Sequence, residues 1–425
     1  MLAQWAGGVW YPMRFAFFLF PLCGLSLSSL LAADWPQFLG PQRNGIAAAE
    51  EPALKGPFKS EPDQLWEKSV GAGFAGPVVS GGKVILFHRE GSDMTTEAVE
   101  AKTGKPLWRT TYVTDYVDSF GFDNGPRAVP AVAEGKVFTH GPEGRVTALD
   151  LETGKELWAY DTASAVNSQP GFFGRAPSPL VVAGKVIIAA GGSLGEKPAG
   201  LIALHAQTGK LVWNSVEDEA GYASPVMLGE TVLAWMRNKL WLVNPETGFV
   251  LDSLPLRASM EASVNAATPV PCGEGQWFVS AGYGVGANLF KITPFQQPAF
   301  EAVWQKQKTL DCHYSTPVFK DGHLYGFDGR QETGQTLRCI EVATGKVCWD
   351  SPGIPGGTLL RVADQLLVVT EQGELWIVKA SPDKFDQVAT VQILRSSHRS
   401  HAAFANGILY ARDTEKVVAI RLGAE

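Results

Sequence analysis

Thr103-Gly-Lys-Pro-Leu-Trp108 is the stretch that decides the fold, because the phrase Thr-Gly-Lys-x-x-Trp returns at Thr153–Trp158, Thr208–Trp213 and Thr344–Trp349. The residues before each copy alternate between apolar and polar, which is the period of a half-buried strand, and Thr-Gly is typical of a tight turn. Each copy therefore predicts two strands joined by a turn. Such a unit repeated along a chain indicates a propeller or a solenoid.

A second landmark allows the units to be counted. One or two small residues, a proline and an apolar pair open each unit, at Pro77, Pro130, Pro179, Pro225, Pro269 and Pro317. Weaker copies follow near Leu360 and Ala403. The spacing of roughly 43 to 53 residues suits a four-stranded propeller blade. We therefore predict an all-β, eight-bladed β-propeller of four-stranded antiparallel blades; a seven-bladed ring is the alternative if the last two units are misread.

The two ends of the array predict how the ring closes. The last unit has three expected strands, at about 401–405, 408–411 and 416–421, and lacks its Trp strand. Gln64–Val70, which contains Trp66, reads as a Trp strand with nothing before it. We infer that this N-terminal strand completes the last blade, which protects the sheet edges.

Two units depart from the phrase. The Thr247-Gly248 copy has Asp252 where Trp is expected, and the fifth unit has Trp304 but no Thr-Gly-Lys turn. Trp and β-branched residues suit a surface buried between adjacent sheets. We expect the repeated Trp residues to pack between blades rather than to bind a ligand.

Composition agrees with one ordered, turn-rich domain. The 425 residues include 46 Gly and 27 Pro, with 45% hydrophobic and 19% charged residues. This composition excludes a disordered chain or a coiled coil. The propeller is expected at residues 64–425, after an extension at 34–63. The net charge of −7 and the lack of a Lys/Arg cluster argue against nucleic acid as a partner, and we expect a monomer.

Residues 1–33 are expected to be a signal peptide, with a true start as late as Met13. Arg14 precedes the apolar run Phe15–Ala33, and Asp34 follows it. This order is typical of a secretory signal. An uncleaved membrane anchor is the alternative, since such a run just spans a bilayer. We therefore expect an exported protein, periplasmic or extracellular, that meets a membrane only through this segment.

Export would permit disulfides among the cysteines after the signal segment, which are Cys272, Cys312, Cys339 and Cys348. Pairing Val342 with Val347 in the last Thr-Gly hairpin would place Cys339 and Cys348 diagonally on one face. That offset is marginal for a bridge without a bulge. Buried free thiols are the alternative.

The repeat resembles the pyrroloquinoline-quinone (PQQ) propeller repeat. The resemblance runs from DWPQFLGPQRNG (Asp34–Gly45) to the end of the chain. It is closest to bacterial PQQ-like propeller proteins, which are related to the outer-membrane assembly lipoprotein. The resemblance implies an eight-bladed propeller; it does not by itself imply the quinone, since one fold hosts many functions.

Quinone dehydrogenases that resemble this fold also have a disulfide ring between two adjacent cysteines, a calcium ion and an Asp that acts as a base. This chain has no Cys-Cys pair, although Asp123, Asn124 and Asn265 could supply oxygen ligands near the blade tips. Calcium needs roughly six to eight converging oxygens. We therefore predict no catalytic residue, no metal ligand and no cofactor, with PQQ and calcium as the alternative.

The loops that lead into the innermost strands carry polar and aromatic residues, which is typical of a concave binding site. The candidates for a ligand-binding funnel are Phe74, Asp123, Asn124, Arg127, Tyr222, Asn265, His313, His398 and His401. Arg127 could bind a carboxylate or only neutralise Asp123. The histidines could titrate, bind metal or simply donate hydrogen bonds.

Three functions stay open at this point. The first is an exported binding or scaffolding propeller of the cell envelope, whose funnel takes a protein, a glycan or a small molecule. The second is a PQQ-dependent dehydrogenase that oxidises an alcohol or a sugar. The third, implied by the resemblance, is an adaptor for outer-membrane protein assembly.

Overall fold

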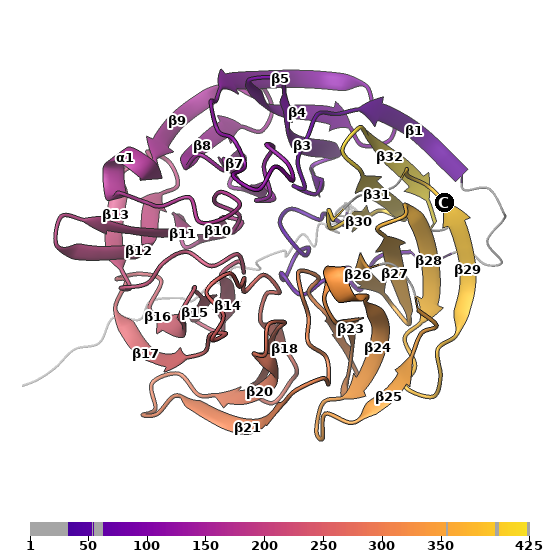
Figure 1. The fold of residues 1–425 in the computed structure, drawn as a ribbon. Helices are drawn as coiled ribbons and strands as arrows, with labels where there is room; N and C mark the ends of the chain where they lie inside the picture. Colours follow the sequence, from indigo (N-terminus) through magenta and orange to yellow (C-terminus); the bar gives the residue numbers. More distant parts are fainter. Residues whose placement is uncertain (1–32, 53, 55–62, 354–355, 396–398, 423–425) are drawn as a thin grey trace, which may run out of the picture. The chain divides into compact units, whose positions relative to one another are not determined.

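Eight four-stranded antiparallel sheets form a ring, so the predicted eight-bladed β-propeller is confirmed and the seven-bladed alternative is wrong (Figure 1). The computed structural model describes residues 33–52, 54, 63–353, 356–395 and 399–422. His398 and all but the last residue of the expected signal peptide lie outside the described residues. Among the described residues, no helix has the length and apolarity needed to cross a membrane.

The first four blades follow the chain, each running from its inner strand outward. Blade 1 contains β2 (Val78–Ser80), β3 (Lys83–Glu90), β4 (Asp93–Glu100) and β5 (Pro106–Val113). Blade 2 contains β6 (Ala131–Ala133), β7 (Lys136–His140), β8 (Arg145–Asp150) and β9 (Glu156–Asp161), followed by the short helix α1 (Thr162–Val166). Blade 3 contains β10 (Leu180–Val182), β11 (Lys185–Leu194), β12 (Lys197–His205) and β13 (Leu211–Ser215). Blade 4 contains β14 (Val226–Leu228), β15 (Thr231–Trp235), β16 (Lys239–Val243) and β17 (Val250–Pro255).

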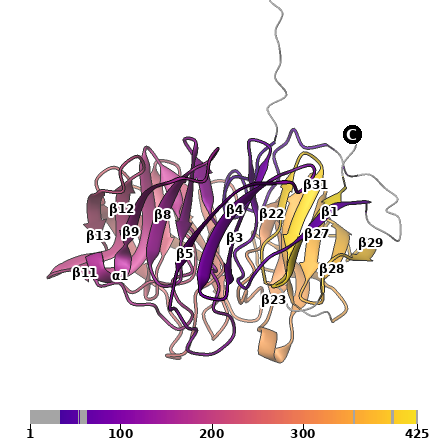
Figure 2. The same cartoon turned by 90° about the horizontal axis from the view of Figure 1, so that it is seen from above.

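The remaining blades repeat the same plan. Blade 5 contains β18 (Val270–Pro271), β19 (Gln276–Ala281), β20 (Gly286–Ile292) and β21 (Phe300–Lys306). Blade 6 contains β22 (Val318–Lys320), β23 (His323–Asp328), β24 (Thr336–Glu341) and β25 (Val347–Asp350), with the 3-10 helix η1 (Gln331–Thr333) between its second and third strands. This helix, drawn in orange, projects from the lower side of the ring in Figure 2. Blade 7 contains β26 (Gly357–Val362), β27 (Gln365–Thr370), β28 (Glu374–Lys379) and β29 (Gln387–Gln392).

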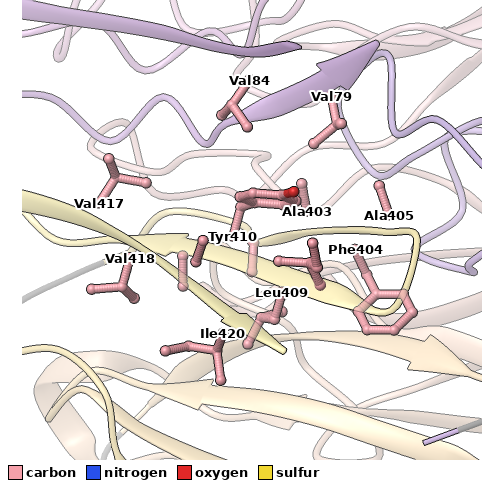
Figure 3. Packing of buried hydrophobic residues seen from close by; sticks show 14 of the residues in the cluster. Val79, Val84, Ala403, Phe404, Ala405, Leu409, Tyr410, Val417, Val418 and Ile420 are labelled. Atoms are coloured by element: carbon pink, nitrogen blue, oxygen red, sulfur yellow. The ribbon is translucent and has the colours of Figure 1, made fainter. Parts of the chain in front are cut away.

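Blade 8 joins the two ends of the chain, as predicted. Its inner strands are β30 (Ala403–Ala405), β31 (Ile408–Arg412) and β32 (Lys416–Arg421), and its outer strand is β1 (Asp63–Ser69), which pairs with β32. The apolar cluster between blades 8 and 1 brings Val79 and Val84 next to Tyr410 and Ala403 (Figure 3). The ring is therefore held by side chains from both ends of the described propeller.

The repeated phrase is explained by contacts between neighbouring blades. The Trp of each phrase donates a hydrogen bond from Nε1 to a carbonyl in the next blade's turn, as from Trp158 to Ala206 at 3.0 Å. In three of the four copies this ring lies against a turn glycine, and a Cβ at Gly209 would stand 2.6 Å from the Trp158 ring. The fourth, Trp349, meets a turn without glycine and packs against Phe385. Gly209 also has a φ of +69°, which favours glycine. The predicted packing role of the Trp residues is confirmed.

The departures from the phrase occur together for the same reason. Blade 5 has no Thr-Gly turn, so the outer strand of blade 4 faces no turn glycine. Asp252 stands in place of the Trp, and its carboxylate accepts a hydrogen bond from the backbone N–H of Ala299 at 2.7 Å. Trp304 of blade 5 meets the intact turn of blade 6 and donates to the Val342 carbonyl at 2.8 Å.

The residue before four of the six landmark prolines also links two blades. The hydroxyl groups of Ser178, Ser224, Thr268 and Thr316 each accept a backbone N–H from the previous blade, over 2.9, 2.9, 3.2 and 3.0 Å respectively. A ladder of side-chain hydrogen bonds therefore runs round this part of the channel wall, where backbone groups would otherwise be buried without partners.

Residues 33–52 form a segment that we call the strap, and it crosses the centre of the ring (indigo in Figure 1). Trp35 exchanges two hydrogen bonds of 2.9 Å with Val79 in blade 1. At the other end of the strap, the Glu51 carboxylate accepts the backbone N–H groups of Asn406 and Gly407 in blade 8, the neighbour of blade 1, at 2.8 and 2.9 Å. Between these ends, Arg43 is buried and donates to the Pro179 carbonyl at 2.7 Å.

The register of the last Thr-Gly hairpin corrects our sequence analysis. Ile340, not Val342, pairs with Val347, and Cys339 pairs with Trp349. Cys348 is the extra residue of a β-bulge, which the alternating pattern does not reveal. Cys272, Cys312, Cys339 and Cys348 are free thiols in the structure.

Candidate ligand-binding funnel

A cavity of about 380 Å³ lies among the loops that lead into the inner strands, and we call it the funnel. Seven Phe and Tyr side chains line it: Phe38, Phe74, Phe122, Phe173, Tyr222, Tyr283 and Tyr314. Its charged and titratable lining residues are Arg127, Arg399, Glu332, His313 and His401. Apolar and small residues complete it, among them Val129, Val264 and Ala266. Size and lining are those of a small-molecule site.

Arg127 is fixed by its own loop. Its guanidinium forms an ion pair of 2.8 Å with Asp118, whose side chain is fully buried, and donates to the Phe173 carbonyl at 2.9 Å. Burial acts to raise the pKa of Asp118, but the N–H groups of Phe120 and Asp123, together with Arg127, hold it below its ordinary value. Arg127 therefore holds two funnel loops together and has few donors left for a ligand.

Arg399 is held differently. Its guanidinium lies 3.8 Å from the Glu371 carboxylate and donates no hydrogen bond to any described residue. The Arg399 guanidinium lies instead over aromatic rings, 5.8 Å from the centroids of Phe74 and Tyr314. Tyr314 in turn donates to Glu371 at 2.7 Å. The guanidinium group of Arg399 thus brings to the funnel N–H donors that no described residue accepts.

Tyr222 joins two loops through its hydroxyl group. The hydroxyl oxygen accepts the backbone N–H groups of Phe172 and Phe173 at 2.7 and 3.0 Å. Burial raises the pKa of this phenol, so it remains protonated at neutral pH. The funnel wall is therefore set by hydrogen bonds before any ligand binds.

His313 is a neutral hydrogen-bonding residue. Its Nε2 lies 2.9 Å from the Tyr283 hydroxyl, and burial lowers its pKa to about 4. The Arg330 guanidinium covers the face of the Tyr283 ring at 4.2 Å and pairs with Glu332 at 3.3 Å. This side of the funnel has its charges already balanced.

Near the strap, the ring of His401 meets Phe38 edge to face, with centroids 4.9 Å apart. The strap contributes Phe38 to the funnel and Gln37 and Arg43 to a second cavity of about 330 Å³, so it lies between the two. Burial lowers the pKa of Arg43 to about 9. This value is still above neutral pH, so the guanidinium remains charged there.

The structure brings five of the nine candidate residues into the funnel: Phe74, Arg127, Tyr222, His313 and His401. Three others hold loops instead. Asp123 accepts the N–H of Gly125 at 2.6 Å, Asn124 accepts the N–H of Asp118 at 2.8 Å, and Asn265 donates to the Met236 carbonyl at 2.9 Å. His398 lies outside the described residues.

Among the lining residues that sequence reasoning missed are Tyr283, Gln331, Glu332 and Phe38. Tyr283 and the Gln331–Glu332 pair come from loops between second and third strands, where the pattern indicates only a turn. An aromatic residue within the glycine-rich turn GYGVG was the available signal for Tyr283. Phe38 comes from the strap, whose path across the ring has no local signature.

The ring and its funnel define an eight-bladed propeller with a cavity at one end of its channel. A family model described as outer membrane protein assembly factor BamB matches residues 92–351, which is more than half of the chain. The chain belongs to this family of PQQ-like repeat propellers.

Two relatives carry different names. The dehydrogenase subunit of the quinone alcohol dehydrogenase from Acetobacter aceti is 28% identical over 229 residues, or 50% of this chain, and the match covers only 30% of that relative. BamB from Burkholderia pseudomallei (strain K96243) is 27% identical over 302 residues, 60% of this chain and 71% of the relative. The crystal structure of quinohemoprotein alcohol dehydrogenase from Comamonas testosteroni superposes with a TM-score of 0.66 at 15% identity, over 92% of this chain and 81% of the other. That likeness shows the fold alone.

The funnel residues do not fit a calcium–quinone centre. Within the described parts of the chain, no three His, Cys, Asp or Glu side chains gather closely enough to hold a metal ion. Glu332 is the only carboxylate among the lining residues named for the cavity, and it is paired with Arg330. Calcium takes roughly six to eight oxygen ligands. The aromatic wall has room for a planar ring, but Glu332 is the one carboxylate named in the lining that is available to hold its metal.

Proposed function

We propose that this chain is an exported binding propeller of the cell envelope, with its ligand in the funnel and no catalysis of its own. The observation that supports this proposal is the 380 Å³ cavity with its aromatic wall. Its loops are fixed by internal hydrogen bonds, such as those to Tyr222 and from Arg127. Preformed, largely apolar cavities with few polar groups are typical of ligand sites.

Export is supported by the apolar run Phe15–Ala33 between Arg14 and Asp34. The name of the BamB relative, an outer membrane protein assembly factor, agrees with an envelope location. Expression in a Gram-negative host followed by N-terminal sequencing tests this: export predicts a mature chain that begins near Asp34. An intact N-terminus on protein recovered from the cytoplasm would contradict it.

A blocking variant tests the funnel. Ala266 lines the cavity, so Ala266→Trp should fill part of it, whereas Val212→Trp adds the same side chain at a position 45% exposed on β13. A thermal-shift screen of metabolites, glycans and peptides on residues 34–425 supplies the probes. Compounds that stabilise the wild type should bind Ala266→Trp at least about tenfold more weakly and Val212→Trp unchanged. Equal binding to all three proteins would place the site elsewhere.

Two other functions have specific support. The match to the quinone alcohol dehydrogenase subunit supports a dehydrogenase, although the funnel lacks the calcium ligands. An assembly adaptor is supported by the BamB relative and by exposed apolar residues beside the funnel, where Val117, Phe120 and Phe122 are 68%, 55% and 59% exposed. Crosslinking at Phe120 in cells would identify a protein partner of that surface.

A further inference from the structure

We propose that Arg399 anchors a negatively charged group of the funnel's ligand, and that this ligand is a carboxylate carried on a flat apolar body. The inference rests on the proposed function, because it assigns a ligand class to that same funnel. It distinguishes Arg399 from Arg127, the arginine that the sequence alone singled out.

The two arginines differ in how many of their donors are already used. Arg127 donates to Asp118 at 2.8 Å, to the Phe173 carbonyl at 2.9 Å and to the Asp123 carbonyl at 3.3 Å. Among the described residues, the only carboxylate paired with Arg399 is Glu371 at 3.8 Å, which is beyond a hydrogen bond. A guanidinium presents five N–H donors in a fork that matches a carboxylate. Arg399 is therefore the arginine that still has donors for a ligand.

The aromatic rings argue against a cationic ligand. An aromatic cage that binds a cation offers free ring faces. Here the guanidinium groups already lie over those rings: Arg399 is 5.8 Å from Phe122, Arg127 is 5.5 Å from Phe173, and Arg330 is 4.2 Å from Tyr283. A ligand cation would meet positive charge at each of these rings, whereas an anionic group meets open donors at Arg399.

The other polar groups of the wall argue against a sugar. The hydroxyl groups of Ser178 and Ser224 accept backbone N–H groups in the blade-to-blade ladder. Tyr222 accepts two N–H groups, and His313 is bonded to Tyr283. A ligand hydroxyl that donates to one of these oxygens would have to compete with the backbone N–H groups that they already accept. An apolar body needs only the aromatic wall and the side chains of Val129 and Val264.

Paired probes test the assignment. Calorimetric titration of residues 34–425 with sodium 2-naphthoate and with uncharged 2-naphthamide compares two ligands of nearly equal shape. We expect the carboxylate to bind roughly tenfold to a hundredfold more tightly, as a charge-assisted hydrogen bond allows. Arg399→Gln should remove that preference. Arg395→Gln should keep it, since Arg395 is 80% exposed on the same β29–β30 connection and pairs with Glu415.

A second variant should strengthen naphthoate binding instead of weakening it. Glu371→Gln removes the carboxylate beside Arg399 and keeps an acceptor for the Tyr314 hydroxyl. It should tighten naphthoate binding severalfold, and it decides the question if Arg399→Gln does not fold.

The outcomes separate the two proposals. If acid and amide bind equally well and neither variant changes this, the Arg399 assignment is overturned while the funnel remains a binding site. If neither probe binds at millimolar concentration, the Arg399 assignment and the binding funnel both fall.

Discussion

Glycine in the Thr-Gly turns has a packing role as well as a conformational one. Gly209 and Gly184 share a φ of +69°, but only Gly209 has a Trp ring against it; the Cβ position of Gly184 has no atom within 4 Å. Each glycine of a Thr-Gly turn therefore lies against a Trp of the preceding blade. The converse does not hold: Asp252 replaces the Trp where the next turn has no glycine, whereas Trp349 is kept against a turn that also has none.

The first prediction separates the clash of a new methyl group with the Trp158 ring from the backbone strain of a positive φ. Gly184→Ala measures the cost of a positive φ alone, about 1–2 kcal/mol. Gly209→Ala should lower the free energy of unfolding by about 1–3 kcal/mol more, because its methyl group overlaps the Trp158 ring. Urea denaturation of both variants measures the difference. Equal losses would show that the Trp ring moves away at no cost.

The second prediction concerns His140. Burial lowers its pKa to about 4, and within the described residues its hydrogen-bond partner is the Pro177 carbonyl at 3.3 Å, with Arg175 nearby. Because the unfolded chain binds a proton near pH 6.5 and the folded chain does not, the free energy of unfolding should fall as pH falls from about 6.5 to about 4. The loss is on the order of 3 kcal/mol.

Denaturation at pH 7 and pH 4.5 measures this loss. His140→Gln cannot titrate, so its stability should depend less on pH than that of the wild type. His313 shifts in the same direction and remains in both proteins, so it does not affect the comparison. An unchanged pH dependence in His140→Gln would contradict the argument.

At the scale of the strand, β1 shows how closure is encoded. The segment could be predicted from sequence because it has a Trp and no preceding turn, while the last unit lacks its fourth strand. Trp66 donates to the Ala101 carbonyl at 2.9 Å and lies against Gly104, so the strand from one end of the propeller meets both blade 8 and blade 1.

The third prediction tests that closure. Trp66→Ala should cost about 3–5 kcal/mol and loosen β1, because a large buried ring is removed from the joint between blades. Hydrogen exchange should then quicken in β32, which pairs with β1, and not in β16 across the ring. Leu107→Ala, at a position 46% exposed on β5, serves as the control. Uniformly faster exchange would mean that β1 has no special part in closure.

Other elements could not be predicted as well. The alternating pattern predicted the strands of the last hairpin but not the bulge at Cys348. The pattern shows that strands are present and does not show which residues pair across them. Most loops before inner strands were found because a landmark proline follows them; the last two units have only a weaker copy of the landmark. The strap was expected only as an extension, because its hydrogen bonds to blades 1 and 8 join residues far apart in sequence.

At the scale of the molecule, the fold and the site differ in how much the sequence determines. Blade number follows from a repeat that every unit must keep in order to pack against its neighbours. The funnel is assembled from single residues on separate loops, so its geometry depends on the closed ring. Arg127 and Arg399 illustrate the limit: both are arginines on such loops. Only the structure shows that Arg127 donates three hydrogen bonds, whereas Arg399 comes no closer than 3.8 Å to the Glu371 carboxylate.

The account's central claim is that the funnel is a binding site without a calcium–quinone centre. Titration of residues 34–425 with PQQ, with and without calcium, tests it most directly when quinone absorbance, melting temperature and alcohol-dependent dye reduction are followed together. The account predicts no effect of calcium on any of the three and no dye reduction. Saturable binding that requires calcium, with dye reduced when an alcohol is added, would contradict it and make the chain a quinone dehydrogenase.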